Sequence, residues 1–70
     1  RNVLTAIGNS GDPALAPAAA ARLDDAAPLV RGAAVWALSR LLDGVAVAAL
    51  RRDDPDPMVA EEWALALEGR

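Results

Sequence analysis

The chain has 70 residues, a formal net charge of -3, and neither cysteine nor histidine. The lack of these two residue types excludes disulfides, most zinc sites, histidine- or cysteine-ligated haem and the Ser-His and Cys-His nucleophile systems. An acidic domain is not a general nucleic-acid binder, because such binding depends on neutralising phosphates, but a local patch of arginines can still contact one.

A chain of this length forms at most one small domain, which we expect to span residues 1–70. Alanine dominates the composition, loses no side-chain entropy in a helix and lets helices pack closely, so we expect an all-α fold. No apolar run reaches the roughly 18 residues that a membrane span needs, and no signal peptide is visible. We therefore expect no membrane partner and a cytoplasmic location, with which the lack of cysteine is compatible.

Residues 2–8 have the pattern of the last turns of a helix, and this is the first helix that we expect. A turn cluster follows, and Asp12 has the position of an N-cap before Pro13. The next helix is expected to run to about Leu23. Because Pro17 lacks a backbone donor, it predicts a kink or an irregular first turn in this helix.

A loop over residues 24–27 precedes a helix that begins at Pro28 and shows the apolar spacing of an amphipathic helix. Asp43-Gly44 ends it. The short helix predicted from Val45 to Arg52 has arginines in its last turn, where cations suit the helix dipole.

A rigid acidic loop leads into the last expected helix, about Pro57 to Glu68, whose three glutamates, Glu61, Glu62 and Glu68, are predicted to face outward. No segment alternates with the period of two that marks a strand. The apolar positions of the two long helices predict one continuous core. Its expected members are Val30, Ala33, Ala37, Leu38, Leu41, Val59, Trp63, Ala66 and Leu67.

The chain repeats itself. Two acidic residues, a short loop, a proline, a large apolar residue and a valine occur in residues 24–31 and again in residues 53–60, about 30 positions apart, a period that marks solenoids. Each such unit cannot bury its apolar face alone, so the units stack. The expected fold is an α-solenoid of about two and a half helix pairs.

These two segments resemble HEAT repeats, in the stretches from Leu23 to Leu38 and from Asp53 to Leu67. The resemblance implies a ladder of Asp and Arg side chains between neighbouring repeats, to which Asp25, Arg31 and Asp54 would contribute. Ala60 stands where the ladder would want an arginine, which suits a terminal unit.

A narrower likeness joins Arg1–Leu15 and Pro28–Leu42, which resemble the C-terminal helical region of the epoxyqueuosine reductases, enzymes that modify tRNA. That family carries cobalamin and two iron–sulfur clusters in upstream domains. The likeness implies a domain that helps to dock tRNA. It brings over no catalytic, cofactor-binding or metal-binding residue, because the cluster ligands are cysteines.

Candidate binding residues are Arg1, Arg31, Trp36 and Arg40. Arg31 either forms a salt bridge with Asp25 or Asp54, or contacts a phosphate or partner. Trp36 lies one step off the apolar stripe and fits either the core or a surface on which bases could stack. The acidic loops fit helix caps and turns better than a metal site, because they lack the ligand run of a calcium loop.

The resulting hypothesis is a non-catalytic interaction domain, the tRNA-docking tail of an iron–sulfur oxidoreductase, with a protein–protein scaffold as the alternative. A HEAT-like DNA glycosylase would need a strongly basic face, which a charge of -3 does not provide. Arginines gathered on one exposed face would favour nucleic acid, and an Arg31 tied to aspartates beside an apolar face would favour a protein.

The chain begins at an arginine in the middle of the repeat pattern, so we interpret it as the C-terminal piece of a longer protein. Val3, Leu4 and Ile7 are then expected to lie against something absent from the sequence, either an upstream domain of the parent chain or a second copy.

Overall fold

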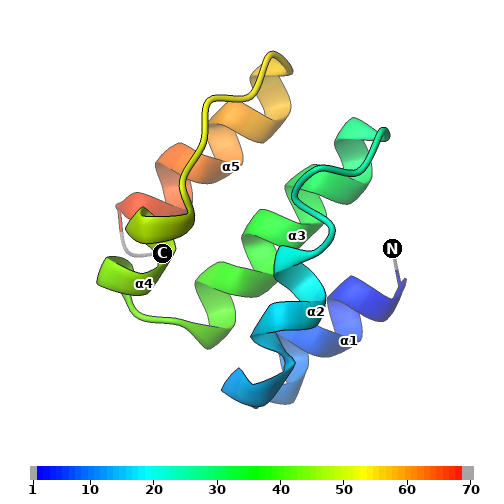
Figure 1. Cartoon of the computed structure of the whole chain (residues 1–70), viewed down its shortest axis with the longest axis vertical. Helices are drawn as coiled ribbons and strands as arrows, with labels where there is room; N and C mark the ends of the chain where they lie inside the picture. The colour runs from blue at the N-terminus through cyan, green and yellow to red at the C-terminus, as the bar shows by residue number, and fades with distance from the viewer. Residues whose placement is uncertain (1, 69–70) are drawn as a thin grey trace.

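The computed structural model describes residues 2–68, and every regular element in that range is helical (Figure 1). In chain order the elements are α1 (Asn2–Ser10), the 3-10 turn η1 (Pro13–Leu15), α2 (Ala16–Ala20), α3 (Pro28–Leu41), α4 (Gly44–Leu50) and α5 (Pro57–Leu67). The fold is an α-solenoid of one single helix followed by two helix pairs, as expected from the repeat.

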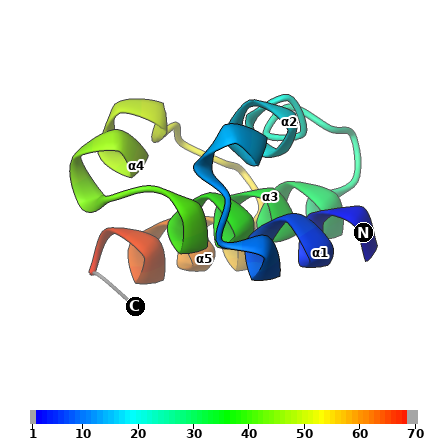
Figure 2. The same cartoon turned by 90° about the horizontal axis from the view of Figure 1, so that it is seen from below.

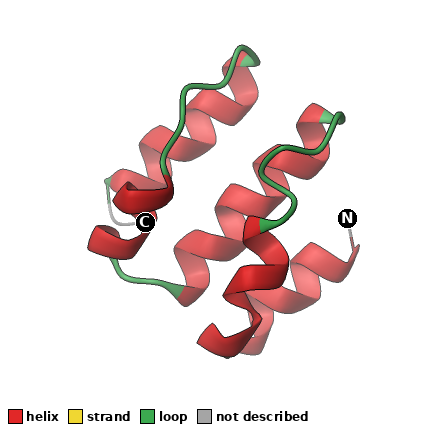
Figure 3. Ribbon diagram, viewed as in Figure 1, coloured by secondary structure: helices red, strands yellow, loops and turns green. Residues whose placement is uncertain are grey.

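The helices form two layers. α1, α3 and α5 lie side by side in one layer, and α2 and α4 form the other (Figure 2). The loops that join α2 to α3 and α4 to α5 run to the same edge of the molecule, where α3 and α5 begin (Figure 3). Equivalent residues of successive repeats therefore meet at this edge.

Aspartates and prolines start the helices. Asp12 and Asp43 each accept a hydrogen bond from a backbone N–H of the first turn, and Asp56 accepts from the N–H groups of Met58 and Val59. Pro28 and Pro57 occupy the first helical position, where the missing N–H costs no intrahelical hydrogen bond. The acidic residues of the loops thus act first as caps.

The helix expected from Pro13 to Leu23 is shorter than predicted. It begins as the 3-10 turn η1, and its α-helical part ends at Ala20. The N–H groups of Arg22 and Leu23 bond to carbonyls three residues back, at 3.0 and 3.1 Å, so the chain continues in tightened turns. Pro17 explains the irregular start, because it offers no N–H to a regular first turn.

The short helix α4 also ends earlier than expected. It stops at Leu50, so Arg51 caps it from outside and Arg52 lies in the following loop. The expectation of arginines within the last turn was wrong.

One core joins both layers. Its fully buried side chains come mostly from α3 and α5, and the partly buried Val30, Ala33 and Leu41 pack against them. Leu67 was expected in this core but is 38% exposed, because it is the last residue of α5 and lies to one side of the buried stripe. The buried members are Leu4, Ile7, Ala16, Ala19, Leu23, Ala34, Val35, Ala37, Leu38, Val47, Val59, Trp63 and Ala66.

The N-terminal helix closes its own face better than expected. Leu4 and Ile7 are 3% and 8% exposed, since α1 packs along α3, and of these three residues Val3 alone is open to solvent, at 70%. The expectation that all three face an absent partner was therefore wrong for Leu4 and Ile7.

Candidate functional site

Arg31 joins the two helix pairs at the edge where α3 and α5 begin. Its Nε donates to Oδ2 of Asp54 at 2.8 Å, and its Nη2 donates to Oδ1 of the same carboxylate at 3.1 Å. This bidentate geometry makes a stronger and more specific ion pair than a single hydrogen bond does. The side chains are only 15% and 6% exposed, so the pair is held away from water.

Asp25 meets Arg31 through its backbone and not through its carboxylate. Nη1 of Arg31 donates to the carbonyl oxygens of Asp25 and Ala26 at 2.9 and 3.1 Å. The Asp25 carboxylate instead accepts from the N–H of Ala27 and lies 3.7 Å from Arg22. Arg31 thus ties together the loops of both helix pairs.

The charges of this pair reinforce each other. The hydrogen bond from Arg31 lowers the pKa of Asp54 below its usual value, helped by the N–H of Asp56, which donates to Oδ1 at 2.9 Å. The same hydrogen bond raises the pKa of Arg31. Because the guanidinium of Arg31 is bonded to Asp54 and to two loop carbonyls, it is poorly placed to contact a phosphate.

A second ion pair between repeats lies beside the first. Nη1 of Arg52 donates to Oδ1 of Asp24 at 2.7 Å. Both side chains are solvent-exposed, at 41% and 81%, which makes this pair much weaker. This pair was not predicted from the sequence, although the repeat contained a signal for it. Asp24 and Asp53 are equivalent positions of the two repeats, and Arg52 directly precedes Asp53, so stacking of the repeats brings Arg52 near Asp24.

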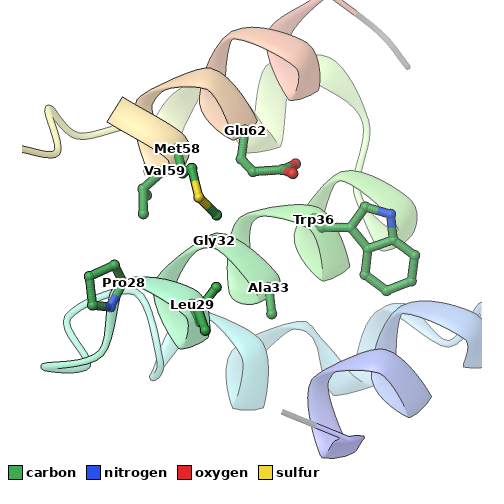
Figure 4. A pocket seen from close by; sticks show the side chains of 8 residues that line it. All are labelled: Pro28, Leu29, Gly32, Ala33, Trp36, Met58, Val59 and Glu62. Carbon is green, nitrogen blue, oxygen red and sulfur yellow. The ribbon is translucent and has the colours of Figure 1, made fainter. Parts of the chain in front are cut away.

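A groove of about 230 Å³ lies between α3 and α5 (Figure 4). Leu29 and Met58, which are 56% and 60% exposed, face each other across one end of it. Both residues directly follow the prolines that start the helices, so they are equivalent positions of the repeat. The groove is lined by Pro28, Leu29, Gly32, Ala33 and Trp36 of α3 and by Met58, Val59 and Glu62 of α5.

The groove opens away from the α2–α4 layer. Leu29 lies nine residues from the buried Leu38, which at about 100° per residue places the two on opposite sides of α3. Gly32 lies in the floor of the groove, where an added Cβ would make an ordinary van der Waals contact with the Glu62 side chain at 3.8 Å. Glu62 was expected to face outward but is half-buried along this groove.

Trp36 closes the other end of the groove and lies partly in the core. Its ring turns away from Leu29 and Met58 (Figure 4) and packs on Gly8 of α1. The guanidinium carbon of Arg40 lies 5.8 Å from the ring centroid, within cation–π range. Trp36 is therefore both core and surface, whereas the sequence left these two as alternatives.

The candidate binding residues do not form one basic face. Trp36 and Arg40 are together at the end of the groove, while Arg31 is held by Asp54 at the loop edge. Arg1 lies outside the described residues.

A second hollow, of about 340 Å³, lies between α1, α2 and the start of α3. Its rim carries both a cation and an anion, Arg22 and Asp25, and its most exposed apolar member is Val3.

No group of three or more His, Cys, Asp or Glu side chains within residues 2–68 is arranged to hold a metal ion. Among the same residues, no helix is both long and apolar enough to cross a membrane.

A family model described as HEAT repeats matches residues 1–68 of the chain. No curated protein matches the chain, and neither does any solved structure.

Proposed function

The chain belongs to the HEAT repeat family, and from this premise we propose that it is a non-catalytic interaction domain that holds a segment of a protein partner in the groove between α3 and α5. Stacked helical repeats create extended surfaces on which partners bind. The groove is the part of that surface where apolar side chains of two repeats come together.

The observation that carries this proposal is the division of roles among the residues that start α3 and α5. The guanidinium of Arg31 is engaged in the ion pair with Asp54, whereas the side chains of Leu29 and Met58 are exposed at the groove. Contiguous exposed apolar surface is a feature of protein–protein interaction sites and of binding grooves. Here the polar group is structural and the apolar groups are available.

The size of the groove favours side chains over a small molecule. Ligand pockets usually enclose roughly 300–1,000 Å³, whereas this groove has about 230 Å³ and is open along its length. An engineered cavity of about 150 Å³ holds one benzene, so the groove has room for one or two aliphatic side chains of a partner.

A second candidate is the docking of tRNA, implied by the likeness to the epoxyqueuosine reductases. The specific observation in its favour is the pair of Trp36 and Arg40, because an arginine beside an aromatic ring is suited to stacked bases. Under this candidate the parent would be an iron–sulfur oxidoreductase, and its upstream domain would be another partner. The chain has no cysteine to ligate a cluster, so it would take no part in that chemistry.

Selection of peptides from a random display library tests the proposal. The selected peptides should bind the wild-type domain and lose binding when Leu29 and Met58 are both changed to serine. Val45→Ser is the matched control, since Val45 is 82% exposed on α4, in the other layer. A bulk tRNA preparation is titrated in parallel against the wild type and Trp36→Ala.

Peptides that depend on Leu29 and Met58 support the protein-binding function. If no peptide does so, and tRNA binds in a way that Trp36→Ala abolishes, the nucleic-acid function replaces it.

A further inference from the structure

We infer that the segment held in this groove is basic and inserts two aliphatic side chains spaced about one helical turn apart. This inference rests on the proposed function and adds the chemistry of the partner. It is carried by the exposed face of α5, by the charge along it and by the length of the groove.

The exposed face of α5 has two acidic side chains between two apolar ones. Met58, Glu61, Glu62 and Leu65 have the spacing i, i+3, i+4, i+7, so they share one face of the helix. Met58 and Leu65 are 60% and 40% exposed, and Glu61 is exposed between them. An apolar partner laid on this face would lie beside two carboxylates.

The charge of this face is not balanced within the helix, because α5 contains no lysine or arginine. Four arginines of the described chain lie in ion pairs with aspartates at the loop edge: Arg22, Arg31, Arg51 and Arg52. Glu62 already makes a contact within the fold. The inference of a basic partner therefore depends mainly on Glu61, which is exposed to solvent. Lysines or arginines on the partner would complement Glu61 and Glu62, whereas phosphates would be repelled by them. Arg40, a cation at the far end of the groove, lies over the Trp36 ring.

The length of the groove sets the spacing of the anchors. The lining residues Leu29 and Trp36 are seven positions apart on α3, which corresponds to about 10 Å at 1.5 Å per residue. A partner helix presents side chains at i and i+4 about 5–6 Å apart, so two anchors fit within this length. Leu29 and Met58 flank the first anchor, and the second lies against Ala33 and Trp36 of α3. Because Met58 is flexible, it can adapt to different anchor shapes.

Calorimetric titration with three matched synthetic peptides tests the inference. The first peptide has two leucines one helical turn apart in an alanine–lysine background. The second replaces its lysines with glutamates, and the third replaces its leucines with alanines. Each peptide is titrated into the wild type, the Leu29→Ser/Met58→Ser variant and the Glu61→Gln/Glu62→Gln variant, with Val45→Ser and Glu68→Gln as controls and circular dichroism to verify folding.

The lysine–leucine peptide should bind at least about tenfold more tightly than either of the other peptides. Both double variants should weaken it by about tenfold or more, and the two controls should leave its affinity unchanged. Added salt should weaken its binding to the wild type and hardly affect the glutamine variant.

Two results would overturn the inference and can be told apart. Equal or tighter binding of the glutamate peptide, with the same dependence on Leu29 and Met58, would refute a basic partner and leave the protein-binding groove in place. Binding that ignores the change at Leu29 and Met58, or no binding by any peptide, would remove both the inference and the groove function.

Discussion

Gly8 of α1 lies directly against the indole ring of Trp36 on α3, so closely that a side chain at position 8 would force the ring or the helix to shift. A Cβ built on Gly8 would come within 3.0 Å or less of three ring carbons, Cζ3, Cη2 and Cε3. Such a distance is well inside ordinary van der Waals contact, and the ring belongs to a half-buried side chain that Arg40 covers in part. The pairing therefore fixes how α1 packs on α3 and where the groove ends.

Gly8→Ala should destabilise the domain even though alanine is the better helix former. The clash with the Trp36 ring costs about 1–3 kcal/mol, and the helix propensity of alanine offsets at most about 1 kcal/mol of it. Urea melts followed by circular dichroism measure the difference. In a Trp36→Leu background the same substitution should become neutral or stabilising. If Gly8→Ala costs the same in both backgrounds, the ring is not the cause.

Gly11, in a loop, and Gly44, at the start of α4, provide matched controls for Gly8. Gly44 has open space around its absent Cβ and begins α4, so Gly44→Ala should leave stability unchanged or raise it by up to about 1 kcal/mol. Gly11 also has open space but a φ of +68°, which disfavours a side chain, so Gly11→Ala should lower the unfolding midpoint. Similar losses at positions 11 and 44 would contradict this distinction between backbone strain and available space.

Asp54→Asn should lower the free energy of unfolding at neutral pH, and this loss should shrink in acid. Because Arg31 lowers the pKa of Asp54 in the folded state, the carboxylate stabilises the fold above its unfolded pKa of about 3.9. That contribution is lost as the pH falls through the lower folded pKa. Urea midpoints of both proteins at pH 7 and at successively lower pH should therefore converge below about pH 4.

Asp24→Asn is the matched control for this experiment, since it breaks the exposed pair with Arg52 at the same edge. It should change the midpoint little at any pH. If it equals Asp54→Asn at neutral pH, the buried geometry of the Arg31 pair has no special role.

Trp63→Ala should unfold much of the domain at room temperature. Trp63 is 3% exposed in the centre of α5, and removal of a buried aromatic side chain costs about 3–5 kcal/mol, a large part of the stability of a domain this small. Val45→Ala, at a position 82% exposed, should have almost no effect. Thermal melts of the two variants provide the comparison, and an unchanged Trp63→Ala melt would mean that α5 does not pack as described.

The repeat made the long-range features of the edge readable from the sequence. Equivalent positions a fixed distance apart must stack, so the sequence could limit the salt-bridge partner of Arg31 to Asp25 or Asp54, and the structure shows that it is the carboxylate of Asp54. The part played by the Asp25 carbonyl could not be predicted in this way, because it depends on the backbone path of a short loop. Leu29 and Met58 were visible as an apolar residue after each proline, but their exposure follows only from the packing of α3 on α5.

The packing of Gly8 shows a second limit. In the sequence it ends the first expected helix, directly before a turn cluster, and a glycine there has a sufficient local explanation. In the structure it lies within α1 and is buried against a residue 28 positions away. Contacts between helices that are distant in the chain are set by tertiary packing. In a single sequence the only trace of such a contact is a small residue, such as Gly8, inside a helix.

The most direct test of the binding groove is a backbone amide NMR titration of the labelled domain with the lysine–leucine peptide. We expect the largest chemical-shift changes at Leu29, Gly32 and Met58, with the indole N–H of Trp36 shifting at the far end of the groove. The amides of α2 and α4, on the opposite layer, should hardly move. Shift changes gathered on α2 and α4, with the amides of Leu29, Gly32 and Met58 unchanged at saturation, would contradict it.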